Sequence, residues 1–455
     1  MGRFESISPL DSRYCSEKLA EYLSEEARIK YQARVEAELA KALAAEGICS
    51  AKIAKEIEAA SKKVTAEEVY EGEKKTKHDV RALVNAIREK VSSEAKPFVH
   101  LSSTSYDIVD TSNSLRYKDA TEKLVLPALL ELEKTFIKIA LREKATVQIG
   151  RTHGQHAEPI TFGFAIASYV SRLGSRIKEI EQAKGLLVGK FSGAVGAYNA
   201  SSLLVKDPLK FEKRIMDGLG LKISPSSSQV VEAEPTTDLI HALISCFSVL
   251  ANFADDMRNL QRSEIAEVGE AFESGQVGSS TMPHKRNPIN FENVKSFYKE
   301  FMPRMTTVYL DQISEHQRDL TNSASQRFIP EVIAGLVLSA DRLNKVCAKL
   351  VVDRENMKRN FEKSSASIVA EPLYILLAFH KHPDAHETVK QLTLEADKVR
   401  KPLMEIVQDE ASLKPFLEKF SKQQMEIISN PEKYTGLSEK KTEIICSSWK
   451  KELGI

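Results

Sequence analysis

The chain has 455 residues, of which 42% are hydrophobic and 28% are charged, and its formal net charge at pH 7 is +1. This length exceeds one ordinary compact domain and is ample for a large buried core, so two or three domains are expected. The nearly neutral balance argues against a general nucleic-acid-binding protein and against a protein that binds membrane surfaces.

The spacing of the cysteines and the lengths of the apolar runs indicate the cellular compartment. The five cysteines are scattered, without a CxxC pair or zinc-ligand spacing, and fit reduced thiols. No apolar run is expected to reach the length of a transmembrane helix, and the charged N-terminus shows no secretory signal. The sequence therefore predicts a cytoplasmic protein without a membrane segment.

Residues 1–111 are expected to form an N-terminal helical domain. The domain begins with a turn near residue 10, which proline and aspartate favour. Helical patterns then follow over 16–46, 50–63 and 65–92. The last pattern contains Lys77-His78-Asp79, which by residue type alone fits a solvated polar face of a helix.

The segment around Thr104-Ser105 resembles the start of a helix. Serine and threonine before an aspartate favour an N-cap, and a helix N-terminus binds anions readily. Thr104 and Ser105 could therefore hold a substrate carboxylate while Asp107 or Asp110 caps the helix that follows. Capping alone is the plainer alternative.

Long helices are expected over a central domain, residues 112–360. The run from Thr236 to Val268 contains neither glycine nor proline, and as one helix it would be about 50 Å long. Another apolar helical run covers Pro330 to Val352. Such lengths predict a long-helix bundle. Residues 361–455 are expected to form a third, helical domain, so the fold class is mainly α.

The stretch 150–159, GRTHGQHAEP, combines two histidines and a glutamate. This composition invites a metal interpretation, but the spacing differs from HExxH and no third ligand cluster is evident, so no metal site is predicted. Gly150 and Gly154 indicate a tight loop that presents His153 to a cleft. A structural histidine in a loop before a helix is the alternative.

A polar loop over 278–288 reads GSSTMPHKRNP. Pro283 and Pro288 stiffen it by fixing φ, and Gly278 gives its entry backbone freedom. A loop of this make-up can close over an anion and present N–H groups and a lysine to developing charge. The alternative is a solvated connection between two helices.

This spelling resembles the signature loop of the fumarase/aspartase superfamily, GSSxMPxKxNP. The resemblance implies a three-domain, mainly α fold with a central long-helix bundle, and a reaction that eliminates fumarate from a substrate with a succinyl group. It also implies that Ser279 is the base that removes a Cβ proton. Lys285 and loop N–H groups would then stabilise the carbanion.

Within the superfamily, RTHGQHAEP is similar to the motif of adenylosuccinate lyases, in which the first histidine protonates the leaving nitrogen. That role falls on His153, since histidine titrates near neutrality. The nearest rival family is 3-carboxymuconate cycloisomerase, which can share MPHKRNP but generally lacks this histidine. A non-catalytic structural protein on the same fold is a further alternative, because fold does not imply function.

The same resemblance implies substrate-binding residues from several parts of the chain: Arg13, Tyr14, Lys77, His78, Asp79, His100, Thr104, Ser105, Gln229, Ser280, Lys285, Arg286, Asn287, Asn293, Arg318, Ser323 and Arg327. Arg318 and Arg327 would hold the nucleotide phosphate and ribose, since the arginine fork makes two hydrogen bonds at once. Ordinary surface pairing is their alternative. Lys77 and Tyr106 depart from the family's pattern.

The implied partners are small-molecule succinyl-purine substrates, with no nucleic acid and no membrane. The resemblance further implies a homotetramer with each active site built from three subunits. That arrangement would explain why His78, His153 and Ser279 lie far apart in the sequence. No metal or redox cofactor is expected, because the C–N bond breaks by elimination.

Overall fold

The computed structural model describes residues 6–14, 16–271, 282 and 284–455. By its contacts the chain divides into two compact units, which are described separately below. Unit 1 comprises Met1–Leu130, Ser175–Ala251 and Val294–Arg342, and unit 2 comprises Glu131–Gly174, Asn252–Asn293 and Leu343–Ile455. The predicted division into domains 1–111, 112–360 and 361–455 stays a prediction.

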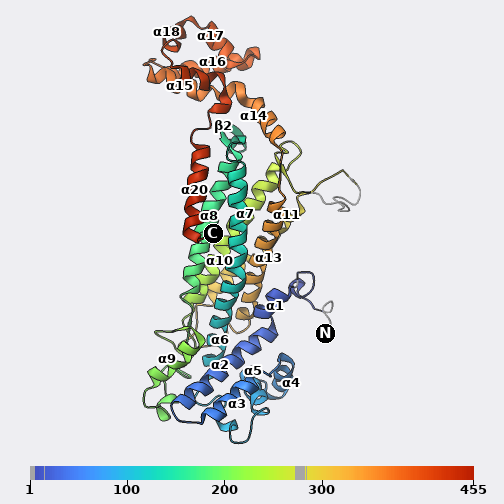
Figure 1. Ribbon diagram of the computed structural model, residues 1–455, viewed down its shortest axis with the longest axis vertical. Coiled ribbons are helices and arrows are strands. Elements are labelled where there is room, and N and C mark those ends of the chain that lie inside the picture. Colours follow the sequence, from blue (N-terminus) through green and yellow to red (C-terminus); the bar gives the residue numbers. More distant parts are fainter. Residues whose placement is uncertain (1–5, 15, 272–281, 283) are drawn as a thin grey trace. The chain divides into compact units, whose positions relative to one another are not determined.

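Most described residues are helical, which confirms the predicted mainly α fold (Figure 1). The α-helices are α1 (Glu17–Leu23), α2 (Glu25–Ala45), α3 (Ala51–Ser61), α4 (Ala66–Thr76), α5 (Asp79–Arg88), α6 (Ser105–Ala120), α7 (Leu126–Arg142), α8 (Phe162–Lys184), α9 (Pro208–Leu219), α10 (Glu234–Leu260), α11 (Ile289–Phe301), α12 (Arg304–Leu310), α13 (Ile329–Ala348), α14 (Arg354–Ile368), α15 (Ala370–Phe379), α16 (Ala385–Val399), α17 (Leu403–Asp409), α18 (Lys414–Leu417), α19 (Lys422–Ser429) and α20 (Ser438–Leu453).

Short helical turns and strands complete the described chain. The short turns are η2 (Pro9–Asp11), η3 (Lys96–Phe98), η4 (Thr121–Val125, a π-helix), η5 (Ser201–Leu203), η6 (Ser325–Phe328), η7 (Ala411–Leu413) and η8 (Pro431–Lys433). The strands pair as β1 (Val147–Thr152) with β2 (Gln155–Thr161), β3 (Val188–Gly189) with β4 (Lys222–Ile223), and β5 (Val268–Gly269) with β6 (Val351–Val352).

Two of the predicted N-terminal helices are each interrupted. The pattern over 16–46 breaks at Ser24, whose backbone is extended and whose hydroxyl accepts a hydrogen bond from Ala27 N at 3.1 Å. Such a cap starts a new helix, so α1 and α2 are separate. The pattern over 65–92 breaks at Lys77, whose φ of +53° ends α4 in the left-handed region.

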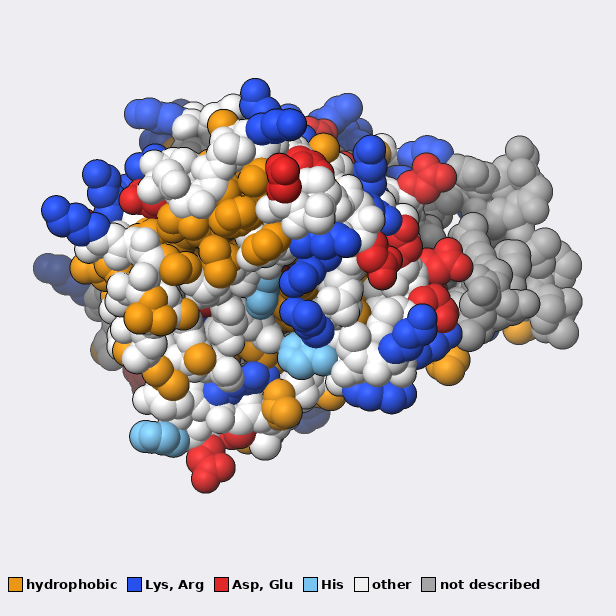
Figure 2. All heavy atoms as spheres, turned by 90° about the horizontal axis from the view of Figure 1, so that it is seen from below, with side chains coloured by type: hydrophobic (Ala, Val, Ile, Leu, Met, Phe, Trp, Pro, Cys, Tyr) orange, Lys and Arg blue, Asp and Glu red, His pale blue; other side chains and the backbone are white. Residues whose placement is uncertain are grey.

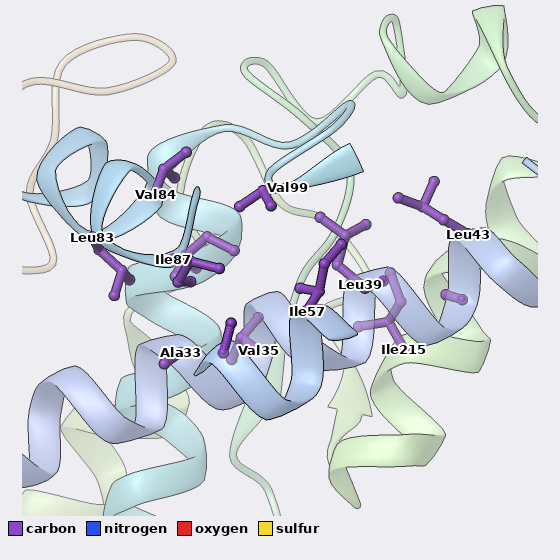
Figure 3. Packing of buried hydrophobic residues seen from close by; sticks show 14 of the residues in the cluster. Ala33, Val35, Leu39, Leu43, Ile57, Leu83, Val84, Ile87, Val99 and Ile215 are labelled. Atoms are coloured by element: carbon purple, nitrogen blue, oxygen red, sulfur yellow. The ribbon is translucent and has the colours of Figure 1, made fainter. Parts of the chain in front are cut away.

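The core of unit 1 forms where α2, α3, α5 and α9 pack together (Figure 3). Helix α2 places Val35 and Leu39 on one face, because residues four apart project from the same side of a helix. They pack in one buried cluster with Ile57 of α3, Ile87 of α5 and Ile215 of α9. This cluster anchors the helices that carry His78 and Ser105.

Helix α10 is shorter than predicted, because it ends at Leu260 instead of running on to Val268. A turn follows, in which Ala266 has a φ of +51°, and the chain then enters β5. An 18-residue window of α10 has a mean hydropathy of 1.4, which makes this helix long and apolar enough to cross a membrane. That contradicts the expected lack of such a run, but 72% of the window is buried, as in a core helix.

Aromatic contacts join the long helices within unit 2. The Phe253 ring of α10 lies 4.4 Å from the Phe136 ring of α7 and 5.2 Å from the Tyr169 ring of α8, between ring centroids. Figure 1 shows these three helices side by side, as a long-helix bundle predicts. A second cluster of buried residues joins α15, α16 and α17 through Leu373 and Val407, among others.

The surface mixes both signs of charge. Figure 2 shows one face, which carries a patch of hydrophobic side chains as well as lysine, arginine, aspartate and glutamate side chains. This mixture agrees with the net charge of +1. Four cysteines are free and buried, namely Cys49, Cys246, Cys347 and Cys446, whereas Cys15 lies outside the described residues.

Candidate functional site

Unit 1 contains a polar cavity of about 320 Å³. The predicted site residues among those that line it are Lys77, His78, Asp79, Ser105, Arg318, Ser323 and Arg327. They come from the α4–α5 junction, from the start of α6 and from the segment that precedes α13. The structure thus brings together side chains that lie up to 250 residues apart in sequence.

The α4–α5 junction places His78 beside Ser105. His78 caps α5, and its Nδ1 accepts a hydrogen bond from Arg81 N at 3.3 Å. Its Nε2 lies 3.5 Å from Oγ of Ser105, the first residue of α6. Because Nδ1 accepts, a neutral ring carries its proton on Nε2 and turns it toward the start of α6.

Asp79 holds two arginines at this cavity. Its Oδ2 lies 3.2 Å from Arg327 Nη2 and 3.9 Å from Arg28 Nη1. Arg28, which the sequence analysis missed, is 7% exposed and lines the cavity from α2. Its position within a helical apolar pattern gave no signal of a binding role. The lining has five arginine or lysine side chains against two carboxylates, Glu73 and Asp79, so its excess of positive charge suits anions.

The side chain of Gln229, another predicted site residue, contacts Arg318 of the cavity lining. Its Oε1 accepts a hydrogen bond from Arg318 Nη1 at 3.1 Å. Nearby, Asp110 is buried and accepts a hydrogen bond from Val231 N at 3.0 Å. Burial raises the pKa of Asp110 to about 7, although that backbone donor favours the ionised form.

Other predicted residues of unit 1 lie outside the lining of this cavity. Nδ1 of His100 lies 2.6 Å from Oε1 of the buried Glu36. Burial works against protonation of His100, yet Glu36 raises its pKa above the usual value. Thr104 is the N-cap of α6, and its N–H donates to Asp107 Oδ2 at 2.8 Å, which confirms that Asp107 takes part in capping this helix.

Arg13 and Tyr14 also lie outside the residues that line the cavity. The ring of Tyr14 meets the ring of Phe297 edge-on, with centroids 4.8 Å apart. The guanidinium carbon of Arg13 lies 5.9 Å from the centre of the Tyr14 ring. Within unit 1 Tyr14 therefore packs on α11 with Arg13 beside its ring, and neither residue lines the cavity.

His153 lies in unit 2, at the tip of a β-hairpin where a loop was expected. Thr152 pairs with Gln155, so His153 and Gly154 alone form the turn, with φ of +53° and +76°. Two positive φ angles are typical of the two-residue turn whose twist matches antiparallel strands. The hairpin leaves His153 exposed at its tip, as a group that reaches a substrate would be.

A buried glutamate supports this hairpin. Glu267 is fully buried, and its carboxylate accepts hydrogen bonds from Arg151 Nη2 at 2.5 Å, Gln148 Nε2 at 2.7 Å and Asn360 Nδ2 at 3.0 Å. Arg151 of the RTHG motif is thus tied to the body of unit 2, two residues before His153. The sequence analysis missed Glu267, because its partners come from distant segments.

His156 also belongs to the hairpin, and its Nδ1 lies 2.6 Å from Ser364 Oγ of α14. Burial and the nearby Arg151 charge lower the pKa of His156. Among the described residues, no group of three or more His, Cys, Asp and Glu side chains is arranged to hold a metal ion.

The signature loop is described only in its second half. Ser279 and Ser280 lie outside the described residues, whereas Lys285, Arg286 and Asn287 lie within them. Lys285 N donates to Met282 O at 3.0 Å, and Arg286 O accepts from Gln261 Nε2 at 3.2 Å.

Helix α11 follows this loop and is capped by Glu270. The Glu270 carboxylate accepts hydrogen bonds from Asn290 N at 2.8 Å and from Phe291 N at 3.1 Å. Glu270 is 6% exposed, so it fixes the point at which the chain leaves the loop. Asn293 lies on the same helix, and its buried Oδ1 has no hydrogen-bond partner among the described residues.

Comparison with known proteins assigns the family. A family model described as lyase matches residues 11–300, and one described as adenylosuccinate lyase C-terminal matches residues 314–435. An adenylosuccinate lyase of Pyrococcus horikoshii is 37% identical over 95% of each chain. The chain belongs to the adenylosuccinate lyase family. Another member, from Bacillus subtilis, is 36% identical over 76% of this chain and 79% of its own.

Solved structures confirm the predicted fold of the fumarase/aspartase type. The 3-carboxy-cis,cis-muconate lactonizing enzyme of Pseudomonas putida is similar with a TM-score of 0.85, covering 96% of this chain and 98% of its own. A fumarate lyase from Mesorhizobium sp. BNC1 gives a TM-score of 0.83 over 95% and 98%. Their sequence identities to this chain are 23% and 22%, so the likeness concerns the fold and does not choose between reactions.

Proposed function

We propose that this adenylosuccinate lyase family member cleaves adenylosuccinate to AMP and fumarate, and acts likewise on the succinyl conjugate of aminoimidazole carboxamide ribotide. The full-length similarity to adenylosuccinate lyases supports this reaction over the muconate reaction of the rival family. The scattered, buried thiols fit a cytoplasmic enzyme.

The observation that carries the proposal is the cavity of unit 1. Each substrate has a phosphate and two carboxylates, and the cavity is lined by Lys77, Arg318 and Arg327 together with the start of α6. Arginine forks and helix N-termini both bind such oxyanions. Asp79 orients Arg327 from within the cavity. This lining supports binding of an anionic nucleotide.

The proposed chemistry is a β-elimination. Ser279 takes the proton from Cβ, and the resulting negative charge spreads into the neighbouring carboxylate, where Lys285 stabilises it. The C–N bond then breaks, its electron pair passes to the nitrogen, and His153 supplies the proton that this nitrogen needs. The double bond forms in the departing fumarate. Ser280, Arg286, Asn287 and Asn293 are proposed to hold the succinyl part.

We infer that the enzyme is a homotetramer with each active site built from three subunits. The exposed His153 supports this inference, because the tip of its hairpin is free to meet another chain. His100, Thr104, Arg13 and Tyr14 are proposed to complete the site in that assembly.

The test is an absorbance assay of purified protein with adenylosuccinate, in which fumarate and AMP are identified as products. His153→Ala and Ser279→Ala are expected to lose turnover while remaining folded. His156→Asn is the matched control, since it changes the other histidine of the motif and keeps a group that can bond Ser364. Wild-type protein that is folded yet releases no fumarate would refute the proposal, and 3-carboxymuconate would be assayed next.

Mixing the two inactive variants tests the shared site. Chains of His153→Ala and Ser279→Ala that exchange subunits would form some sites with an intact histidine and an intact serine. Activity is therefore expected to return after the mixture has been dissociated and reassembled. Failure to recover activity in mixed tetramers would place both residues of each site on one chain.

A further inference from the structure

An aromatic ring and an amide hold Arg318 in place. The guanidinium carbon lies 3.4 Å from the centre of the Tyr106 ring, and Nη1 donates to Gln229 Oε1 at 3.1 Å. Arginine cations within about 6 Å of a ring centre are attracted to its face, and the planar group can also stack on it. At this shorter distance Arg318 lies against the ring face.

The ring of Tyr106, against which Arg318 packs, is held in place by burial and by the first turn of α6. It is the second residue of α6 and is 9% exposed. The first turn of α6 is fixed by Asp107, which is fully buried, caps Thr104 N at 2.8 Å and also binds the ammonium group of Lys190. The ring therefore keeps its place relative to Ser105, which lines the same cavity.

Arg318 needs such a platform because it lies on a loop. The segment between α12 and η6 contains turns without a regular helix or strand. A mobile arginine side chain loses rotamer entropy when it is fixed for binding. Contacts with Tyr106 and Gln229 fix the guanidinium before any ligand arrives, so binding no longer bears that cost.

The same contacts leave one edge of the guanidinium without an acceptor. Its Nε and Nη2 are buried and have no hydrogen-bond partner among the described residues. A buried donor without an acceptor is unfavourable, because it has lost its hydrogen bonds to water, so an acceptor is expected for these two groups when a ligand binds. Nε and Nη2 form one side of the planar fork, which matches two oxygens of a phosphate or carboxylate.

We propose that Tyr106 is a positioning residue, whose ring holds Arg318 so that its Nε–Nη2 edge meets an oxyanion of the substrate. This inference rests on the proposed function for the identity of that substrate. Tyr106 acts through Arg318, and its hydroxyl group is not needed.

Tyr106→Leu tests the proposal, because it removes the ring face and keeps an apolar side chain. The expected result is a KM for adenylosuccinate that rises roughly fivefold to tenfold, with kcat changed by less than about twofold. Tyr106→Phe is the conservative variant and is expected to restore KM. Phe416→Leu is a matched control, since it removes a ring that lies 5.2 Å from Lys419 Nζ in unit 2.

A double-mutant cycle separates positioning from simple packing. If Tyr106 acts through Arg318, then Tyr106→Leu adds nothing to KM in an Arg318→Ala background. A full, additive effect in that background would overturn the proposal. An unchanged KM in Tyr106→Leu alone would overturn it as well, and so would a failure of Tyr106→Phe to restore it.

Binding of product-like anions keeps this test independent of turnover. Calorimetric titration with inorganic phosphate, AMP and fumarate would show which oxyanion depends on Tyr106. Weaker binding of phosphate and AMP alone would assign the phosphate, and weaker binding of fumarate alone would assign a carboxylate. Wild-type protein without lyase activity would refute the proposed function, whereas equal binding of all three anions by wild type and Tyr106→Leu would refute the role of Tyr106.

Discussion

Arg151 in unit 2 and Arg318 in unit 1 both lie in segments that sequence motifs single out, and the protein holds them in different ways. The guanidinium of Arg151 donates two hydrogen bonds to the buried Glu267, from Nη2 to Oε1 at 2.5 Å and from Nη1 to Oε2 at 3.2 Å. Arg318 rests on a ring and an amide, and its Nε and Nη2 have no acceptor among the described residues.

The difference separates an arginine that supports the fold from one that we propose to bind substrate. Nη1 and Nη2 of Arg151 are bound to Glu267, so this residue fixes the strand that leads to His153. The Nε–Nη2 edge of Arg318 has no such internal acceptor among the described residues. Residue type is the same in both places, and the partners decide the role.

The largest expected effect comes from removing the carboxylate that Arg151 uses. Glu267→Ala would leave the guanidinium without its carboxylate and the amide donor of Gln148 without its acceptor, while Asn360 would keep its bond to Ile265 O. Breaking a buried ion pair in this way costs about 3–5 kcal/mol of unfolding free energy. Denaturant unfolding would measure the loss.

Glu158→Ala is the control for this change, because Glu158 is exposed on the same hairpin. Its unfolding free energy is expected to stay within about 0.5 kcal/mol of wild type. Equal effects of the two variants would mean that the Glu267 network does not support the hairpin.

An intermediate effect, on binding instead of stability, is expected for Arg318→Lys. Lysine lacks the planar fork, so KM for adenylosuccinate should rise roughly tenfold to a hundredfold, while the unfolding free energy stays within about 0.5 kcal/mol. Arg151→Lys should do the opposite, lowering the unfolding free energy more than it changes KM. The comparison fails if Arg318→Lys destabilises the protein and leaves KM unchanged.

The smallest effect, counted per pH unit, concerns Glu133, a buried acid without the partners that Glu267 has. It is fully buried, and neither carboxylate oxygen has a hydrogen-bond partner among the described residues. Burial raises the pKa of Glu133 to about 9, from 4.5. The folded state therefore binds the proton more tightly, and stability falls as pH rises between these two values, by at most about 1.4 kcal/mol per pH unit.

Glu133→Gln should remove this contribution, because glutamine does not ionise. Unfolding free energies measured from pH 5 to pH 9 would show a flatter profile for the variant, roughly within the window that the pKa values define. Glu131→Gln changes an exposed glutamate on the same helix and should leave the slope unaltered. A wild-type slope that persists in Glu133→Gln would assign the effect to other groups.

Local sequence patterns predicted much of the fold and part of the site. The 3.6-residue spacing of apolar residues indicated the long helices, because burial of one face is a local property. Motif spelling marked His78, Ser105 and Arg318, and the structure places all three at one cavity. The cap at Asp107 followed from a serine and threonine run before an aspartate.

The features that escaped prediction depend on distant partners or on single backbone angles. Glu267 acquires its role from residues more than 90 positions away, so no local pattern marks it. The interruption at Ser24 depends on one extended residue, and the hairpin at 147–161 depends on a turn that a histidine enters with positive φ. Neither is encoded by apolar periodicity.

Only two residues, His153 and Gly154, connect the paired strands at the turn that carries the histidine. The position of the histidine is set by the register of the strands beneath it, with Thr152 opposite Gln155 and Ile149 opposite Pro159. A single inserted residue would either lengthen the turn or shift one strand and turn its side chains to the opposite face. The reach of His153, the proposed acid, therefore depends on backbone pairing, and an insertion at this tip would change that reach even though the tip is exposed.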